Sequence, residues 1–357
     1  MNVINQVRLT LEKAVRLGAS DIHLIPGQAR GVLKYRIDGE LGEAEDIHLI
    51  LLQKMIAHFK FISGMDPGER RKPQSRSIEK PVLKELISIR ISTFPSCASE
   101  TMVMRIFRLT RALHLKDLAL FPDQGKRLMT LLRKSQGLIL FCGPTGTGKT
   151  TTLYSLLEHQ LNMQSLNVMT LEDPVERRYS GILQTEINER AGLSYAAGLK
   201  SILRHDPDVI MLGEIRDDET AASAVRAALT GHLVFSTLHS SSSTGALMRL
   251  HELGIPYSDL QESVTAIVSQ SLVHLNCPLC GFTCSAHCEH DAFRRRAAIF
   301  EFLENDELTA TITQMKQGKS VSHLPRQQMD NLMIKATALG YIKNEVSQMI
   351  NKQRWWT

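Results

Sequence analysis

Apolar residues follow two different spacings in the first part of the chain. Four aliphatic residues recur at every fourth position, as on one face of an α-helix: Val3, Val7, Leu11 and Val15. Segments 32–38 and 86–92 instead alternate apolar and polar residues, which is typical of strands with one covered face. A second helical pattern is centred on Met55. This mixture predicts an α+β domain over residues 1–110.

The pattern changes beyond residue 126, where short, continuously apolar segments alternate with helical ones. The apolar segments are 137–143, 166–173, 208–214 and 232–239. Strands without polar alternation are covered on both faces, so these segments predict a mainly parallel sheet between layers of helices. We therefore expect an α/β domain over residues 126–275. A linker over 111–125, which contains Pro122 and Gly125, is expected to precede it.

The segment GPTGTGKT, residues 143–150, lies between the first apolar segment and a helical one. It matches the phosphate-binding pattern G-x-x-x-x-G-K-[ST] and indicates a P-loop, RecA-like ATPase domain. An incidental glycine-rich turn is the competing interpretation, and the strand–loop–helix context disfavours it. We expect Lys149 to reach the β- and γ-phosphate oxygens and Thr150 to hold Mg²⁺. The expected nucleotide-binding residues are Gly143, Pro144, Thr145, Gly146, Thr147, Gly148, Lys149, Thr150 and Thr151.

Polar side chains follow three further strands of the expected sheet. Glu172 and Asp173 end one apolar segment, Glu214 ends the next, and His239 ends another. The carboxyl ends of parallel strands meet at one edge of a sheet, so we expect these residues to converge on the phosphate as catalytic residues. Glu214 is the expected water-activating base and, with Thr150, a contact of Mg²⁺. The competing interpretations are a solvated carboxylate for Glu214 and a structural histidine for His239.

Composition narrows the possible functions. The chain has 42 Lys and Arg against 37 Asp and Glu, a net charge of +5, and 5% aromatic residues. Grooves for single-stranded nucleic acid combine basic tracks with stacking rings, so a helicase or translocase is the weaker alternative, and we expect no direct nucleic-acid binding. No apolar run approaches the roughly 20 residues that span a bilayer, and the first residues lack the apolar block of a signal peptide. These features predict a cytoplasmic protein.

Four cysteines lie close together in the last part of the chain: Cys277, Cys280, Cys284 and Cys288. In a reducing compartment such a cluster indicates a metal site before a disulfide. Because Zn²⁺ takes Cys and His ligands, we expect a structural zinc here, and His287 or His290 is an alternative ligand to a cysteine. A set of thiols without metal is the competing interpretation. The cluster begins an expected, mainly helical region over residues 276–357.

Several longer segments resemble the secretion and type IV pilus assembly ATPases, the GspE/PilB-like family, across nearly the whole chain. They are ASDIHL (19–24), YRIDG (35–39), LEDPVE (171–176), HDPDVIMLGEIRDDET (205–220) and TGHLVFSTLHS (230–240). The short amino-terminal region is similar to that of the competence pseudopilus ATPases of Gram-positive bacteria (ComGA type). Retraction ATPases of similar length are an alternative, and the cysteine cluster argues against them because it resembles a zinc element of the assembly branch.

The resemblance implies a homohexameric ring, peripherally associated with the inner face of the cell membrane. ATP hydrolysis in this ring is expected to move a polytopic inner-membrane platform protein and so to drive assembly of a pilus or pseudopilus. The resemblance also implies that Arg90 and Arg105, on two strands of an expected hairpin, act on the nucleotide from the amino-terminal domain. An arginine fork suits the spread charge of a phosphoryl transition state. Outward-facing positions of alternating strands are the competing interpretation.

Overall fold

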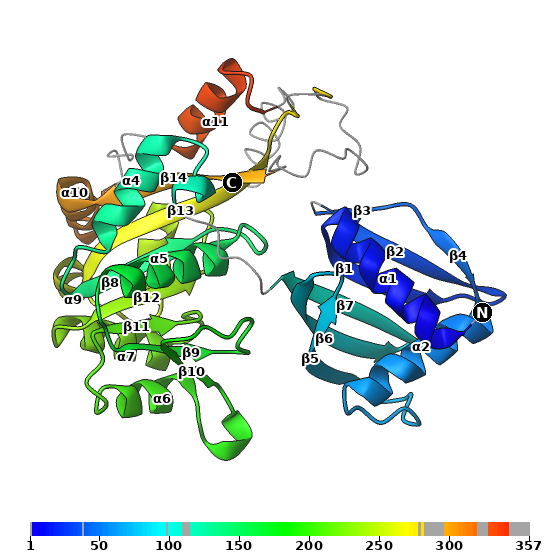
Figure 1. Ribbon diagram of the computed structural model, residues 1–357. Coiled ribbons are helices and arrows are strands. Elements are labelled where there is room, and N and C mark those ends of the chain that lie inside the picture. Colours follow the sequence, from blue (N-terminus) through cyan, green and yellow to red (C-terminus); the bar gives the residue numbers. More distant parts are fainter. Residues whose placement is uncertain are drawn as a thin grey trace. The chain divides into compact units, whose positions relative to one another are not determined.

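The computed structural model describes residues 2–37, 39–97, 99–108, 115–277, 280–281, 296–319 and 328–342. These residues form two compact units (Figure 1). The amino-terminal unit comprises residues 2–108, and the carboxy-terminal unit comprises the described residues from 115 onwards. Within this described part of the chain, no helix is long and apolar enough to span a membrane.

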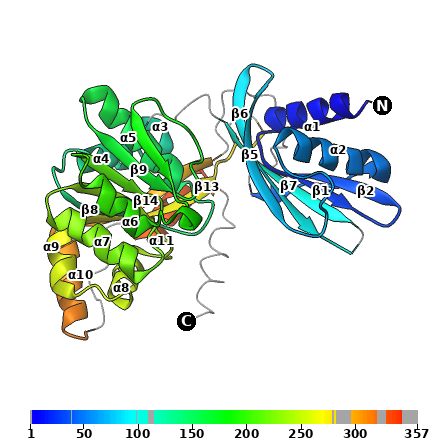
Figure 2. The same cartoon turned by 90° about the horizontal axis from the view of Figure 1, so that it is seen from below.

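The amino-terminal unit is a seven-stranded antiparallel sheet with the order β3-β2-β1-β7-β6-β5, in which β4 pairs with β2. Its helices, α1 (Val3–Leu17) and α2 (Leu49–Ile62), cover one face of this sheet (Figure 2). Its strands are β1 (Ala19–Pro26), β2 (Arg30–Ile37), β3 (Glu40–Leu41), β4 (Glu45–His48), β5 (Gln74–Val82), β6 (Glu85–Pro95) and β7 (Glu100–Arg108).

The alternation of the sequence explains the amino-terminal sheet. In β6, Ile87, Ile89 and Ile91 are fully buried against the helices, while Arg90 between them is exposed on the other face. The helix α1 begins where the Asn2 side chain accepts the Ile4 N–H, and it ends at Gly18. With φ at 67°, Gly18 has the left-handed conformation that glycine adopts without steric cost.

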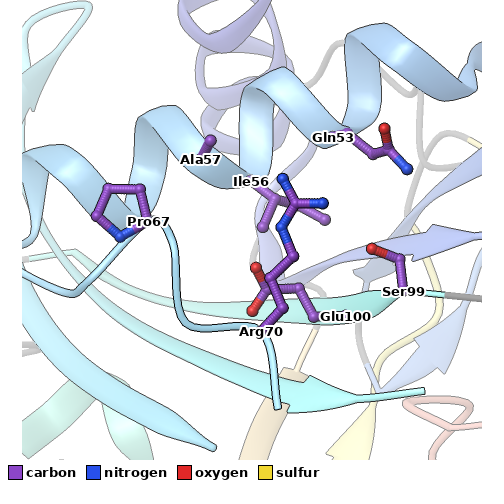
Figure 3. Close-up of a pocket in the computed structure, with 7 residues that line it drawn as sticks. All are labelled: Gln53, Ile56, Ala57, Pro67, Arg70, Ser99 and Glu100. Carbon is purple, nitrogen blue, oxygen red and sulfur yellow. The ribbon is translucent and has the colours of Figure 1, made fainter. Parts of the chain in front are cut away.

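A buried ion pair joins α2 to the start of β7. The Lys60 ammonium is fully buried and donates to both Glu100 carboxylate oxygens, at 2.9 and 3.0 Å, and to the Glu69 carbonyl at 2.6 Å. Glu100 also borders a small pocket (Figure 3), lined by Gln53, Ile56, Ala57, Pro67, Arg70, Ser99 and Glu100. Since a buried charge that loses its partner is strongly destabilising, this pair holds the helix, the following loop and the strand together.

The carboxy-terminal unit is a seven-stranded sheet with the order β10-β9-β11-β12-β8-β13-β14. Only β14 runs antiparallel to its neighbour; the other pairs are parallel. The strands are β8 (Gly137–Cys142), β9 (Val168–Glu172), β10 (Ile182–Glu186), β11 (Val209–Leu212), β12 (Leu233–Leu238), β13 (Val264–His274) and β14 (Arg296–Glu304). The four continuously apolar segments thus form parallel strands whose residues are almost all buried, as the sequence predicts.

Helices cover both faces of this sheet. On one face lie α3 (Leu115–Leu118), α4 (Pro122–Leu131) and α5 (Lys149–Met163). On the other lie α6 (Tyr195–Ile202), α7 (Asp218–Leu229), α8 (Ser243–Glu252), α9 (Tyr257–Ser263) and α10 (Asn305–Lys316). The remaining elements are the short helix η1 (Glu189–Ala191) and α11 (Met329–Ala338). This layered parallel sheet is the α/β architecture that the sequence indicates.

Two segments outside the expected 126–275 domain belong to this unit. Part of the expected linker forms α3 and α4, and Gln124 on α4 is fully buried. Its side chain donates to the Phe300 carbonyl at 2.7 Å and accepts the Phe300 N–H at 3.2 Å. Phe300 lies in β14, within the region expected to be mainly helical, so this region also supplies the last strand of the sheet.

Candidate active site

The phosphate loop, residues 143–150, connects the end of β8 to the start of α5. Its glycines have left-handed φ angles, 148° at Gly143, 83° at Gly146 and 84° at Gly148, which few other residues adopt. Gly148 caps the amino terminus of the 15-residue helix α5. The N–H groups at such a terminus carry partial positive charge and bind anions, so the loop has the form that a phosphate needs.

Lys149 places a buried cation inside the loop. Its ammonium donates to the Gly143 carbonyl at 2.7 Å and to the Pro144 carbonyl at 2.9 Å. Burial lowers the pKa of Lys149, and the negative charge of Glu214 acts in the opposite direction. Phosphate oxygens compete well for such a cation because hydrogen bonds between charged groups are the strong ones. The donor set of the loop therefore fits a nucleotide phosphate.

Three of the predicted residues lie together at the carboxyl edge of the sheet. Asp173, Glu214 and His239 follow β9, β11 and β12, which are neighbours in the sheet. His239 Nε2 lies 3.4 Å from Glu214 Oε2, and Arg216 Nη1 lies 3.5 Å from Asp173 Oδ2. Arg216 also forms an ion pair with Glu214. This strand-end cluster, Asp173, Glu214, Arg216 and His239, is the convergence that parallel topology predicts.

The backbone around Glu214 is held by both neighbouring strands. The Gly213 N–H donates to the Leu171 carbonyl at 2.8 Å, and the Thr237 hydroxyl donates to the Gly213 carbonyl at 2.7 Å. A Cβ atom at Gly213 would lie 2.8 Å from the Tyr195 hydroxyl oxygen, so a glycine permits this close approach. The Glu214 side chain is 17% exposed. It is thus fixed in position and remains accessible to water.

Glu172 has different surroundings from the residues of the strand-end cluster. It is the last residue of β9, it is buried, and its carboxylate accepts hydrogen bonds from the Thr170 hydroxyl at 2.6 Å and from Gln184 Nε2 at 3.2 Å. The Tyr154 hydroxyl, from α5, donates to the same carboxylate. Burial raises the pKa of Glu172, and these three donors lower it. The structure therefore separates Glu172 from Asp173, although they are adjacent in sequence.

Arg90 and Arg105 are cross-strand partners on β6 and β7 of the amino-terminal unit. Arg105 Nε donates to Asp21 Oδ1 at 2.9 Å, and Asp21 is buried. Arg90 is exposed, and we find no ion pair of its guanidinium within the described ranges. Both residues lie on the sheet face opposite the helices. Their action on a nucleotide stays a prediction.

Two of the four cysteines predicted to bind zinc lie in the described part of the chain. Cys277 Sγ accepts the Cys280 N–H at 3.4 Å, and Cys277 pairs with Gly281 through backbone hydrogen bonds of 2.8 and 3.2 Å. Cys284 and Cys288 lie outside the described residues. Among the residues that are described, no group of three or more His, Cys, Asp and Glu is arranged to hold a metal. The tight turn of Cys277 and Cys280 is compatible with two ligands on one ion.

Sequence reasoning missed three polar residues near the site: Tyr154, Gln184 and Arg216. Arg216 stands two positions after Glu214, and this closeness in sequence to a predicted catalytic residue could have indicated that Arg216 belongs to the site. Tyr154 occupies a buried position of α5, and a buried hydroxyl usually has a hydrogen-bond partner. Gln184 carried no such signal, since β10 was not predicted.

Comparison with known proteins agrees with this geometry. The family model of the type II/IV secretion system protein matches residues 1–350. The chain belongs to this family. It is 42% identical to competence protein ComGA of Bacillus subtilis, over 99% of this chain and 98% of ComGA. It is 43% identical to ComGA of Halalkalibacterium halodurans, over 96% and 97% of the two chains. With a putative type II secretion system protein E of Escherichia coli it shares 36% identity, over 99% of this chain and 75% of that protein.

Solved structures of similar fold extend the comparison. The crystal structure of the pilus retraction motor PilT with bound ADP has a TM-score of 0.70 and 27% identity, over 95% of this chain and 94% of PilT. The ATPase DotB of Legionella pneumophila has a TM-score of 0.71 at 21% identity, over 96% and 94% of the two chains, and is similar in fold. The chain is therefore an ATP-hydrolysing P-loop enzyme that uses ATP and Mg²⁺.

Proposed function

We propose that this ATPase is the motor that assembles a competence pseudopilus, the fibre that serves DNA uptake. The observation that carries this proposal is a complete phosphate loop with an adjacent strand-end cluster. The chain that contains them matches 98% of the length of ComGA. A pilus retraction ATPase is the second candidate. It is supported by the fold of PilT, at the lower identity of 27%.

Each residue of the site has a proposed role. The loop N–H groups and Lys149 bind the phosphates, and Thr150 supplies a hydroxyl ligand to Mg²⁺. Glu214 would accept the proton of the attacking water and, with Thr150, would help to hold Mg²⁺. His239 and Asp173 border that carboxylate, and Arg216 balances its charge. When bound, Mg²⁺ would neutralise part of the negative charge of the nucleotide phosphates, and these side chains would lie around them.

The proposed working form is a homohexameric ring at the cytoplasmic face of the membrane. In this form the ring acts on a polytopic inner-membrane platform protein and binds no nucleic acid directly. The modest charge of +5 and the 5% aromatic content support the last point. We also propose that Cys277, Cys280, Cys284 and Cys288 hold one structural zinc, for which the turn between the first two cysteines gives partial support.

The proposed function is tested in the source bacterium after deletion of the gene. Complementation with Lys149→Ala is expected to leave cells without assembled fibres and without DNA uptake, because the phosphate-binding cation is removed. Lys200→Ala is the matched control, since Lys200 is an exposed lysine on α6 of the same unit. Fibres that assemble normally in the deletion strain, but are not withdrawn, would support a retraction motor instead.

A further inference from the structure

Gln270 lies beside the phosphate loop on β13, a strand that carries none of the residues of the strand-end cluster. The strand β13 runs parallel to β8, and Ser269 lies opposite Cys142, the last residue of β8. Gln270 is therefore the first residue of β13 beyond the point where β8 turns into the loop. It is 2% exposed, and its Nε2 donates to the Thr147 carbonyl at 2.7 Å.

This one residue also contacts two glycines of the loop. A Cβ atom at Gly143 would lie 2.5 Å from the Gln270 carbonyl oxygen, and one at Gly148 would lie 3.3 Å from Gln270 Nε2. The first distance is too short for any side chain, because the neighbouring atom belongs to backbone. The backbone and the side chain of Gln270 thus form part of the wall against which the phosphate loop curls.

The hydrogen bond to Thr147 determines which way the next N–H group points. The peptide between Thr147 and Gly148 is trans, so its carbonyl and its N–H point in opposite directions. With the carbonyl held by Gln270, the Gly148 N–H is directed away from β13. Among the described residues this N–H donates to no backbone carbonyl, so it is available to an anion in the loop.

The other end of the Gln270 amide supports a role beyond packing. Gln270 Oε1 is buried and has no hydrogen-bond partner among the described residues. Buried polar atoms are usually paired, and an apolar side chain of similar size would avoid this unpaired acceptor. What the amide offers here that an apolar side chain would not is its N–H donor, which contacts the phosphate loop.

We propose that Gln270 is a positioning residue of the phosphate loop, which orients the Gly148 N–H toward the β-phosphate of ADP or ATP. This inference rests on the assignment of residues 143–150 as the nucleotide site. The Gln270 side chain makes no hydrogen bond to Glu214 in the described part of the chain, so its proposed contribution is the same in the bound ground state and in the transition state. Its loss therefore weakens nucleotide binding and raises KM, with little change in kcat.

The test is the affinity of the full-length protein for ADP and ATP after Gln270→Leu and Gln270→Met, which keep the bulk and remove the N–H donor. Each variant is expected to bind both nucleotides about tenfold more weakly, as for loss of one oriented charge-assisted hydrogen bond. We expect kcat at saturating ATP to stay within about threefold of wild type. Two apolar variants are used so that the test remains possible if one of them fails to fold. Folding of each variant is checked by its unfolding temperature without nucleotide.

Gln160 provides a matched control in the same unit. It too is buried, its Nε2 donates to a backbone carbonyl, that of Leu132, at 3.4 Å, and its Oε1 has no partner in the described part of the chain. It lies in α5 eleven residues after Lys149, about 17 Å along the helix axis. Gln160→Leu removes the same kind of donor, a buried side-chain amide N–H, and is expected to lower the unfolding temperature with no change in nucleotide affinity.

The outcomes separate this inference from the proposed function. If Gln270→Leu binds ADP as tightly as wild type while Lys149→Ala does not bind it, the nucleotide site stands and the role of Gln270 is wrong. An equal loss of affinity in Gln270→Leu and Gln160→Leu would also overturn it, because the effect would then follow from stability alone. If Lys149→Ala binds ADP normally, the site assignment itself fails.

Discussion

Glu172 ends β9 and Glu214 follows the neighbouring strand β11, yet their carboxylates have different partners. Glu214 is paired with Arg216 and lies near His239, whereas Glu172 is buried beneath α5 among hydroxyl and amide donors. The direction of the side chain decides this difference, because successive residues of a strand point to opposite faces. Sequence reasoning located both residues at the same sheet edge and had no means to tell the two environments apart.

Tyr154→Phe tests whether ionised Glu172 takes part in turnover. Burial raises the pKa of Glu172, and the Tyr154 hydroxyl is one of the donors that lower it. Without the hydroxyl this pKa rises further, so Glu172 stays protonated to higher pH. We expect the acidic limb of the pH profile of kcat to move to higher pH, with at least about a threefold loss of kcat on that limb and a smaller loss on the alkaline side.

The control for this variant is Tyr179→Phe. The Tyr179 ring stacks on Tyr154 with centroids 4.4 Å apart, and its hydroxyl makes no hydrogen bond to Glu172. Its removal is expected to leave the pH profile unchanged. If the profile of Tyr154→Phe also coincides with that of wild type, Glu172 has a structural role only.

Arg90→Ala is expected to reduce kcat at least about tenfold, while ATP binding and ring assembly are retained. The reason is the loss of a guanidinium that we propose to stabilise transition-state charge. Arg105→Ala is expected to reduce kcat similarly, but it also removes the nearer of two ion-pair partners of buried Asp21, the other being Arg36, and so lowers stability. Arg90 therefore gives the cleaner measurement.

Arg76→Ala is the control for Arg90. Arg76 is exposed on the adjacent strand β5 and pairs with Ile91, so it lies one residue out of register with Arg90 and on the other face. Steady-state ATPase rates are compared for variants that elute as rings in size-exclusion chromatography. Normal rates in Arg90→Ala and Arg105→Ala rings would leave both arginines as ordinary surface residues.

At the scale of elements, the strands that were predicted differ from those that were missed in how polar they are. The four predicted strands of the carboxy-terminal unit are mostly apolar, and the one carboxylate among them, Glu172, ends its strand. By contrast, β13 and β14 carry Gln270 and Glu301 in their interiors. Both polar residues are buried and bonded to distant segments: Gln270 to Thr147, and Glu301 to the Ser243 hydroxyl at 2.6 Å. Partners so far away in sequence leave no trace in local periodicity, which is why these strands were not found.

The cysteine element gives a prediction of its own. Protein purified without a metal-affinity tag is expected to contain about one zinc per chain, because the free energy of metal binding contributes to the folding of a short cysteine-containing segment. Cys277→Ser is expected to lower the zinc content severalfold and to reduce the unfolding temperature. Cys97→Ser, at an exposed position of the amino-terminal unit, is the control. Metal analysis that finds no zinc in the wild-type protein would exclude the site.

At the scale of the whole molecule, each of the two units buries a hydrophobic core of its own. Their architecture followed from periodicity, and the family followed from the motifs, since the family model covers residues 1–350. The proposed arrangement of six such chains in a ring would depend on surfaces between subunits, which no local pattern encodes. The proposed motor activity therefore rests on the chemistry of the site, and the site is where it is best tested.

The most direct measurement is single-turnover cleavage of bound ATP by Glu214→Gln. The carboxamide keeps the size of the side chain and does not accept the proton of water, so we expect ATP affinity within about threefold of wild type and cleavage at least about 100-fold slower. Glu219→Gln on α7, an exposed carboxylate of the same unit, is expected to behave as wild type. Cleavage by Glu214→Gln at a near wild-type rate would contradict the assignment of Glu214 as the catalytic base.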